Sequence, residues 1–274
     1  MAGRYAGKVA VITGAASGLG EAGARLFVAE GGKVVVADYS SERGNAVAKD
    51  LGSNGIFVKC DVTVEADIAA AFDAAISTWG RCDGAWANAG IVGLAGPIAE
   101  ADMDQFDKTM AVLARGVFCT FKHAARVMIK AGNGGCLIGT ASVAAVKGGM
   151  GPHAYAMAKA GVVGLCRNMA SELAPFRIRA NAIAPGSIPT GMTAHVITGD
   201  PNNVAAAAER MASMSPLGRA PHANDIAETA LFLMSEAGSY ISGQCFVVDG
   251  GDTETVRANP TWAGSRMVVA REGD

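Results

Sequence analysis

The sequence predicts an α/β protein: a single domain with a doubly wound parallel sheet of seven strands and helices on both of its faces. Short β-branched runs alternate with longer alanine-rich helical patterns along most of the chain. Strand candidates such as Val34–Ala37 are apolar without interruption, which is typical of a strand covered on both faces. Because no Pro/Ser-rich linker or internal repeat divides the 274 residues, right-handed crossovers are expected to wind one continuous sheet.

The elements follow one another in a regular order, as a Rossmann-type sheet requires. Strands are expected in the apolar runs at 8–13, 33–37, 55–59, 83–87, 135–140, 178–184 and 244–248. Helices are expected in the alanine-rich segments at 18–30, 41–51, 65–79, 103–130, 153–174 and 223–235. The first helix has apolar positions at Leu19, Leu26 and Phe27 and stops at Gly31-Gly32.

Two segments fall outside this rhythm. Residues 187–222 contain four prolines and are rich in Met and Ala, so we expect a small helical lid above the sheet. The single domain is expected over 1–251, with 252–274 as a C-terminal tail. Such a tail is either mobile or docked, here against a neighbouring subunit.

Composition excludes several classes of function. The net charge is -2, and without a basic excess neither nucleic acid nor an anionic membrane is an expected partner. No apolar run approaches the roughly 18 residues that a membrane span needs, and the first residues lack the pattern of a signal peptide. The six cysteines are scattered without a C-x-x-C pair, which favours free thiols in a reducing cytoplasm. The four histidines are equally dispersed, so we expect no metal site.

A glycine-rich turn, 13–20 (Thr-Gly-Ala-Ala-Ser-Gly-Leu-Gly), lies between the first strand and the first helix. Glycines at these positions let the backbone approach a pyrophosphate, and the helix N-terminus offers free N–H groups to its charge. A purely structural turn is the alternative. The residues expected to bind a dinucleotide here are Gly14, Ser17, Gly18, Leu19 and Gly20.

An acidic residue, Asp38, ends the second strand eighteen residues after Gly20. A carboxylate there accepts hydrogen bonds from the adenosine ribose hydroxyls and repels a 2′-phosphate. Ala15 and Ala16 supply no basic side chain to the turn, and Arg43 comes five residues too late. NAD is therefore favoured over NADP as the cofactor.

Two further strand ends fit the same cleft. Asp61 and Val62 follow the third strand, where the carboxylate could meet the adenine amino group or cap the helix from residue 65. Asn88, Ala89 and Gly90 end the fourth strand with small residues that let a cofactor lie across it. Together with Asp38, these positions favour the binding interpretation.

Three residues, Ser142, Tyr155 and Lys159, form the predicted catalytic group. Positions i and i+4 share one face of a helix, so the phenol and the ammonium point the same way. A cation about 4 Å from the phenol contributes roughly 4 kcal/mol at an effective dielectric of about 20, or about three pKa units. Burial opposes this effect, which leaves an expected pKa of the Tyr155 phenol between about 7 and 9, suited to general acid–base catalysis. A buried tyrosine beside a snorkelling lysine is the alternative.

At these residues the chain resembles the short-chain dehydrogenase/reductase family, with matches from about residue 7 to residue 251. Besides the motifs above, they include 185–190 (Pro-Gly-Ser-Ile-Pro-Thr) and 249–251 (Asp-Gly-Gly). The resemblance implies that Ser142, Tyr155 and Lys159 are catalytic, that Tyr155 and Lys159 also contact the cofactor, and that the protein is a homotetramer. It further implies a cofactor-binding role for four residues after the sixth strand: Pro185, Gly186, Ile188 and Thr190.

The chain departs from the family pattern at two positions. Ala87 replaces the first Asn of the motif Asn-Asn-Ala-Gly, which we interpret as a structural loss. Leu113 stands where the family has its fourth catalytic residue, an Asn. Because leucine cannot hold a water between the lysine and solvent, hydride transfer is expected to survive while proton exchange with bulk water is slowed.

The expected substrate is an uncharged, hydrophobic cyclic secondary alcohol or its ketone. The segments expected to form its cleft are 91–94, 144–150 and the residues after Thr190, most of them apolar or small. The motifs at 122–126 (Lys-His-Ala-Ala-Arg) and 151–155 (Gly-Pro-His-Ala-Tyr) resemble the branch with secoisolariciresinol, xanthoxin, borneol and isopiperitenol dehydrogenases, which implies terpenoid-like alcohols and NAD. The alternatives are a hydroxysteroid dehydrogenase, another ketoreductase, or a catalytically weak NAD-binding protein.

Overall fold

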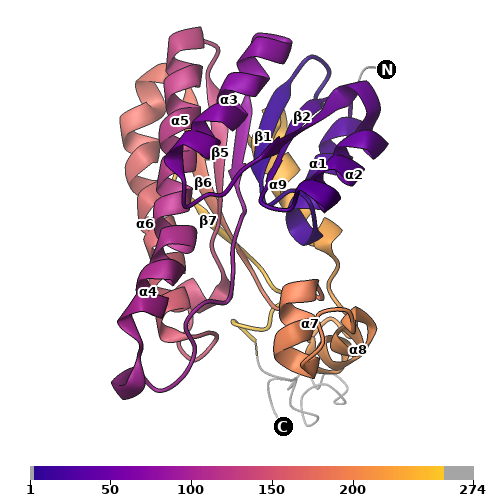
Figure 1. Ribbon diagram of the computed structural model, residues 1–274, viewed down its shortest axis with the longest axis vertical. Helices are drawn as coiled ribbons and strands as arrows, with labels where there is room; N and C mark the ends of the chain where they lie inside the picture. Colours follow the sequence, from indigo (N-terminus) through magenta and orange to yellow (C-terminus); the bar gives the residue numbers. More distant parts are fainter. Residues whose placement is uncertain (1–2, 256–274) are drawn as a thin grey trace, which may run out of the picture.

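The computed structural model describes residues 3–255. Its sheet has seven parallel strands in the order β3-β2-β1-β4-β5-β6-β7 (Figure 1). The strands are β1 (Val9–Thr13), β2 (Lys33–Asp38), β3 (Gly55–Lys59), β4 (Gly84–Ala87), β5 (Gly135–Thr140), β6 (Ile178–Pro185) and β7 (Cys245–Val248). The predicted fold class is therefore confirmed, and each strand lies within one residue or so of its expected position.

Helices cover both faces of the sheet, as the continuous apolar strands require. One face carries α3 (Glu65–Trp79), α5 (Gly116–Ala131) and α6 (His153–Leu173), and the other carries α1 (Gly18–Ala29), α2 (Ser41–Leu51) and α9 (Ala223–Met234) (Figure 1). Side chains alternate between the two apolar layers: Leu137 of β5 belongs to the first and its neighbour Ile138 to the second. The core thus consists of two layers that share the sheet.

The expected helix over 103–130 is interrupted in the structure. It consists of α4 (Met103–Met110), a π-helical turn at Ala111–Arg115, and α5. The cap of α4 follows the usual chemistry, because the Asp102 carboxylate accepts a hydrogen bond from the Gln105 backbone N–H at 2.8 Å. Periodicity alone does not distinguish a π turn from an α turn, and such turns occur frequently at functional sites.

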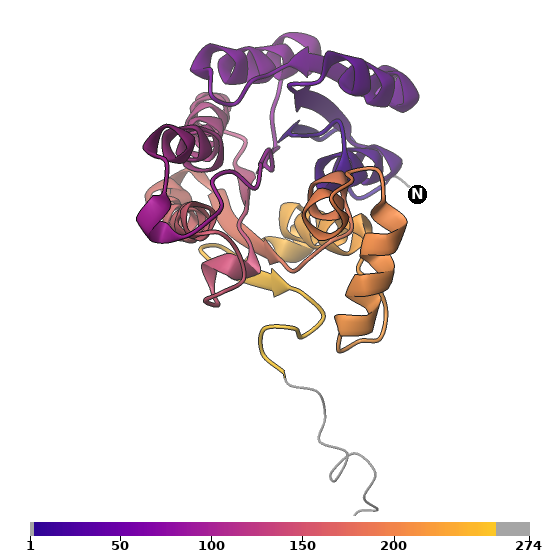
Figure 2. The ribbon, with the colours of Figure 1, turned by 60° about the horizontal axis from the view of Figure 1, so that its bottom comes forward.

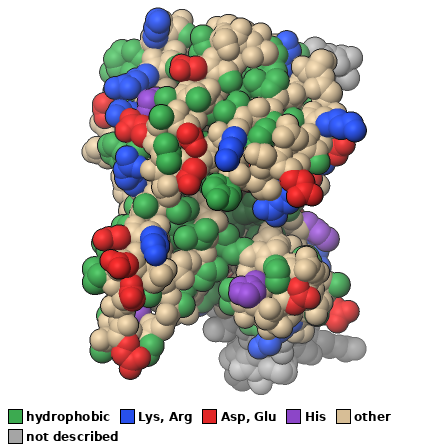
Figure 3. Space-filling view, in the orientation of Figure 1, with side chains coloured by type: hydrophobic (Ala, Val, Ile, Leu, Met, Phe, Trp, Pro, Cys, Tyr) green, Lys and Arg blue, Asp and Glu red, His purple; other side chains and the backbone are tan. Residues whose placement is uncertain are grey.

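The segment 187–222 forms the expected helical excursion. It contains α7 (Gly191–Thr198) and α8 (Val204–Met214), which lie beyond the carboxyl ends of the strands (Figure 2). Opposite them, across a hollow lined by hydrophobic side chains, lies the part of the molecule that carries α4 (Figure 3). The lid and the α4 region therefore flank the edge of the sheet where the predicted site residues lie.

Strand order reverses between β1 and β4, and this crevice is where doubly wound sheets bind ligands. The predicted tail begins inside the described part but continues beyond residue 255, outside the described residues. Within residues 3–255, no helix is both long and apolar enough to cross a membrane. The same residues hold no group of three or more His, Cys, Asp or Glu that suits a metal ion, and all six cysteines are free.

Candidate active site

The glycine-rich turn has the backbone geometry that a close approach to a ligand needs. Gly14 and Gly18 adopt φ of 66° and 56°, in the left-handed region that favours glycine. A Cβ at Gly20 would lie 2.3 Å from the Gly14 carbonyl oxygen, so the turn can close only with glycine there. Ser17 precedes α1 without capping it through its side chain, and half-buried Leu19 lies in the first turn of the helix. The N-terminal amides of α1 therefore face the predicted pyrophosphate site.

The carboxylate of Asp38, at the end of β2, is hydrogen-bonded to this turn. Its Oδ2 accepts a hydrogen bond from the Ala16 backbone N–H at 3.0 Å, and its Oδ1 accepts one from the Ser40 N–H at 2.9 Å. Each carboxylate oxygen can accept a further bond, so the side chain can still receive ribose hydroxyls. Tyr39, which the sequence reasoning did not single out, follows with 71% of its surface exposed and places no cation beside Asp38.

Asp61 lies where β3 ends but does not cap the following helix. Its Oδ1 accepts hydrogen bonds from the backbone N–H and the hydroxyl of Thr63, at 2.9 and 2.7 Å. The residue at the cap position of α3 is Val64, so the capping alternative is wrong. Val62 is buried and packs against Gly116 at the start of α5, which makes its side chain structural.

Asn88 was predicted to bind the cofactor, but its side chain turns inward. Its Nδ2 donates to the carbonyl oxygens of Thr13 and Gly14, each at 3.2 Å. A Cβ at Gly14 would lie 2.8 Å from the Ala89 Cα, so the turn after β1 and the end of β4 touch. The amide of Asn88 therefore holds the cofactor turn from behind, while Ala89 and Gly90 form the floor between the two strands.

The predicted catalytic residues come together at the carboxyl edge. Ser142 follows β5 and Tyr155 and Lys159 lie on α6; the serine and the lysine are 8% and 3% exposed. The Lys159 Nζ lies 5.5 Å from the centroid of the Tyr155 ring, so the two side chains share one face of the helix as expected. The same Nζ donates a hydrogen bond of 2.6 Å to the Thr140 carbonyl, a partner that the spacing could not predict.

Burial determines the titration of this group. It raises the pKa of Tyr155 above the ordinary value of 10, while a hydrogen bond with Ser142 lowers it in part. Burial also lowers the pKa of Lys159 from 10.5 to about 8. The expected phenol pKa between about 7 and 9 is therefore wrong in this geometry: burial outweighs the hydrogen bond from Ser142, and the Lys159 ammonium donates to the Thr140 carbonyl.

Leu113 occupies the π-helical turn before α5 and is fully buried. Its Cδ2 would lie 3.4 Å from a Cβ at Gly90, and the Lys159 Nζ would lie 3.8 Å from the same point. The side chain thus covers the space beside Gly90 and the lysine with hydrocarbon. An asparagine in this position would offer hydrogen-bonding groups that leucine lacks.

The residues after β6 close the other side of the crevice. Pro185 ends the strand, and the Gly186 N–H donates to the Val248 carbonyl at 3.0 Å, which anchors this segment to β7. Ile188 is buried, and its carbonyl accepts the Thr193 hydroxyl. Thr190 begins α7 and reaches back to the glycine-rich turn, since its Cγ2 would lie 3.4 Å from a Cβ at Gly18. The segment therefore spans the crevice from the lid to α1.

A cavity of about 580 Å³ lies between the lid and the loop after β7. Its apolar lining includes Ile188 and side chains of both lid helices, among them Val196, Ile197, Met211 and Met214. The expected lid contribution is therefore present. The loop at 144–150 does not line this cavity, which lies to the lid side of the catalytic group.

The residues present fit a dinucleotide: a glycine cradle, free helix amides and a carboxylate lie at the switch point of the sheet. Beside them lies a hydroxyl–phenol–ammonium group that can move a proton at a carbonyl oxygen. This fold and this site define a class of protein, an oxidoreductase that uses a nicotinamide cofactor.

Comparison with known proteins gives the family. A family model described as "Enoyl-(Acyl carrier protein) reductase" matches residues 14–253. Short-chain dehydrogenase reductase ATA1 of Arabidopsis thaliana is 42% identical over 253 residues, covering 90% of this chain and 92% of that protein. Momilactone A synthase of Oryza sativa subsp. japonica is 41% identical over 253 residues, covering 90% of each. The crystal structure of levodione reductase matches with a TM-score of 0.85 at 36% identity, covering 92% of this chain and 100% of that one. The chain belongs to the short-chain dehydrogenase/reductase family.

Proposed function

We propose that this protein is an NAD-dependent alcohol dehydrogenase that interconverts a hydrophobic cyclic secondary alcohol and its ketone. The observation that carries the proposal is the buried group of Ser142, Tyr155 and Lys159 beside the glycine-rich turn. NAD accepts or returns the hydride when it is bound in the crevice. All other parts of the reaction are assigned to side chains of this chain.

Ser142 holds the substrate oxygen, and Tyr155 exchanges the hydroxyl proton with it. Lys159 is buried without a carboxylate bonded to it among the described residues, and its Nζ lies 5.5 Å from the centroid of the Tyr155 ring, so its assigned role is to favour the phenolate once the proton has left. Because burial raises the pKa of Tyr155, alcohol oxidation is expected to speed up toward alkaline pH, where the phenol can act as a base. Ketone reduction is expected to show the opposite trend.

Asp38 supports NAD as the cofactor. Its carboxylate lies at the end of β2 with its oxygens already bound to the turn, so a 2′-phosphate would meet a fixed negative charge. Within the described residues, neither the turn nor Tyr39 offers a cation to compensate, and the guanidinium of Arg43 is bound to the Ser40 hydroxyl, to which its Nε donates at 3.3 Å. Cofactor contacts at Gly14, Ser17, Gly18, Leu19, Gly20 and Asp38 form part of this proposal, as do contacts at Ile188 and Thr190.

The apolar side chains that the lid contributes to the cavity support a hydrophobic substrate. Aliphatic and thioether side chains from the lid form one part of the cavity wall and adapt to bulky apolar ligands, while Arg210, Arg219 and three aspartates form the other part. Two of the proteins that the chain resembles are, by their names, a momilactone A synthase and a levodione reductase. A terpenoid-like ring alcohol fits both observations. A hydroxysteroid dehydrogenase or another ketoreductase is the nearest alternative within the same chemistry.

The buried Leu113 favours one different candidate, a catalytically weak NAD-binding protein that acts through partners. The proposed working form is a cytoplasmic homotetramer, in keeping with the family resemblance.

The test is the absorbance of NADH with a panel of cyclic secondary alcohols, run with NAD and with NADP. Tyr155→Phe removes the proton carrier with little change in volume and is expected to lower turnover by a factor of about 10² to 10⁴. Val64→Ala, at an exposed position before α3, is the control for handling and folding. NAD binding without turnover of any alcohol by the wild-type protein would favour the weak-catalyst candidate instead.

A further inference from the structure

Trp86 has the largest of the fully buried side chains in the described part of the chain. It lies in β4, one strand away from the catalytic loop, and its ring fills the space above α1. A Cβ at Gly23 would lie 2.2 Å from its Cζ3, so the glycine and the indole are complementary. Packing alone would explain an aromatic residue here. It would not explain where the polar end of the indole points.

The indole Nε1 donates a hydrogen bond of 2.8 Å to the Thr140 hydroxyl, the last residue of β5. A threonine hydroxyl has one proton to donate, and this one is directed at the Asn88 Oδ1 at 3.3 Å. Trp86 can only donate to the hydroxyl and the Asn88 Oδ1 can only accept from it, so the directions of both bonds are determined. The indole thus sets the orientation of two polar side chains.

Both of these residues hold a part of the reaction centre, Asn88 through its side chain and Thr140 through its backbone carbonyl. Asn88 donates to the carbonyl oxygens of Thr13 and Gly14 in the cofactor turn. The backbone carbonyl of Thr140 accepts the Lys159 ammonium at 2.6 Å. Thr140 therefore connects the glycine-rich turn, through Asn88, with the catalytic lysine, and Trp86 donates the hydrogen bond that fixes the Thr140 side chain.

We propose that Trp86 is a positioning residue, whose indole N–H keeps Thr140 and Asn88 in the orientation that aligns the catalytic lysine with the cofactor turn. The inference rests on the proposed dehydrogenase activity. It assigns a role in catalysis and cofactor binding to a core residue that touches neither substrate nor cofactor.

The charged surroundings of Lys159 make the effect measurable. Tyr155 of the same helix is the titratable side chain whose ring lies against it. From β5 the neighbours are the neutral Thr140 and Ser142, and from the π-helical turn the neighbour is Leu113. Within the described residues, burial is the cause that lowers the pKa of this lysine. A misplaced Thr140 carbonyl removes the acceptor that favours the charged form, so the lysine carries less charge and the phenol becomes a weaker acid.

The experiment compares Trp86→Phe, Thr140→Val and the double variant with the wild-type holoenzyme. Phenylalanine keeps most of the apolar contact but lacks the N–H. Each single variant is expected to lower kcat by about tenfold with little change in the KM of the alcohol, as for a small misplacement of catalytic groups. The acid limb of the kcat profile is expected to move to higher pH. The double variant is expected to be no slower than the slower single one, since both remove the same hydrogen bond.

A second readout does not depend on turnover. Calorimetry with NAD is expected to show a several-fold weaker affinity for Trp86→Phe, because Asn88 no longer holds the Gly14 carbonyl. Phe72→Leu is the matched control, a comparable loss of buried apolar contact on the opposite face of the sheet. It is expected to lower Tm while leaving the pH profile and the NAD affinity unchanged.

The outcomes separate this inference from the proposed function. If the wild-type protein oxidises an alcohol but Trp86→Phe only lowers Tm, with an unchanged pH profile and unchanged NAD affinity, the positioning role is wrong and Trp86 only packs. If the losses of kcat in the two single variants multiply in the double variant, the two residues do not act through one shared hydrogen bond. If the wild-type protein turns over no alcohol, the proposed function fails, and the NAD affinities of the variants still decide the inference.

Discussion

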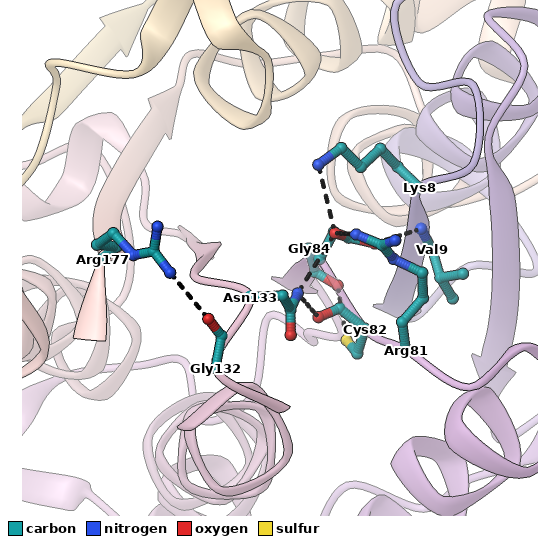
Figure 4. Close-up of polar contacts among 9 residues, drawn as sticks. Lys8, Val9, Arg81, Cys82, Gly84, Gly132, Asn133 and Arg177 are labelled. Carbon is teal, nitrogen blue, oxygen red and sulfur yellow. Dashed lines mark hydrogen bonds and ion pairs between the residues drawn. The ribbon is translucent and has the colours of Figure 1, made fainter. Parts of the chain in front are cut away.

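The two edges of the sheet differ in whether a buried charge has an oppositely charged partner. At the amino edge, Asp83 precedes β4 with its carboxylate mostly buried, and two cations and neutral hydrogen-bond donors surround it. Arg81 donates to both of its oxygens at 2.6 and 2.8 Å, and the Val9 N–H donates at 3.0 Å. Lys8 lies 3.5 Å away (Figure 4). Asn133, which follows α5, donates to the Cys82 carbonyl at 3.2 Å, so the group also joins separate loops.

At the carboxyl edge, the buried Lys159 donates to a neutral backbone carbonyl. Its charge lies beside the Tyr155 ring rather than against an acid. The cost of burial is therefore not offset, and the pKa falls to about 8. The comparison shows two uses of buried charge in one sheet. The paired charge of Asp83 holds loops together, and the unpaired charge of Lys159 lies where we expect the chemistry. Ionisable groups with perturbed pKa values are common at functional sites.

The amino edge also contains a cavity, of about 690 Å³, with a basic rim. Its cations have structural partners: Arg177 donates to the Gly132 carbonyl after α5 at 2.9 Å (Figure 4), and Arg179 donates to the Ile241 carbonyl at 3.1 Å. Cations at helix C-termini stabilise the free carbonyls there. These two arginines therefore stabilise the fold at the amino edge, as Arg81 does.

The largest effect is expected from Lys159→Met, which removes the unpaired buried charge at the carboxyl edge. Turnover is expected to fall by at least about 10², because the phenol loses its cation. Stability, however, is expected to rise by up to about 3 kcal/mol near pH 7, since one pKa unit is worth about 1.4 kcal/mol and the folded pKa is lowered from 10.5 to about 8.

The sign of this effect depends on pH. Below about pH 8 the folded and unfolded chains both carry the charge, so the cost of burying it is complete. Between about 8 and 10.5 the unfolded chain binds more protons, so wild-type stability rises with pH and the gap to Lys159→Met closes. Urea unfolding at several pH values measures the gap. A gap that is constant from pH 6 to pH 10 would contradict the buried charge.

An intermediate effect is expected from Asp83→Asn at the amino edge. Hydrogen bonds to the charged Arg81 and the Val9 N–H are weakened, so the free energy of unfolding is expected to fall by about 2 kcal/mol. Turnover and NAD affinity are expected to stay unchanged, since this edge carries no chemistry. A loss of activity larger than the loss of folded protein would contradict the division between the two edges.

The same variant tests the pH dependence. Partners lower the pKa of Asp83 below the ordinary 3.8 despite its burial, so its contribution is complete above about pH 4 and is lost as pH falls through the folded pKa. Asp83→Asn is therefore expected to flatten the acid limb of the stability curve. Asp104→Asn, in the exposed first turn of α4, serves as the control.

The smallest effect is expected from Leu113→Asn, which gives the unpaired Lys159 a polar neighbour. An amide near Gly90 and Lys159 favours the charged form, so the pKa of the lysine is expected to rise toward its ordinary value. Turnover is expected to change by less than about tenfold, the size of one net hydrogen bond. A pH–rate profile measures it, and an unchanged turnover and profile would show that the missing Asn does not limit proton exchange.

Much of the fold was readable from local pattern. The strand and helix positions follow from β-branched runs and alanine-rich segments, and the glycine-rich turn and Asp38 mark the ends of β1 and β2. The helix spacing correctly placed Tyr155 and Lys159 on one face. The π-helical turn at Ala111–Arg115 could not be predicted, because its residues have ordinary helical preferences.

The sequence by itself determined the features that depend on neighbours along the chain. These are the strands that are apolar on both faces, the glycine-rich turn, and a phenol one helical turn before an ammonium. The tertiary structure alone decided that Asn88 turns inward, that Lys159 bonds Thr140 rather than the phenol, and that Trp86 joins them. The physical reason is that these bonds cross between β1, β4, β5 and α6, which are brought together only when the sheet assembles. Local spacing sets where a side chain starts, and the packed elements around it decide which partner it reaches.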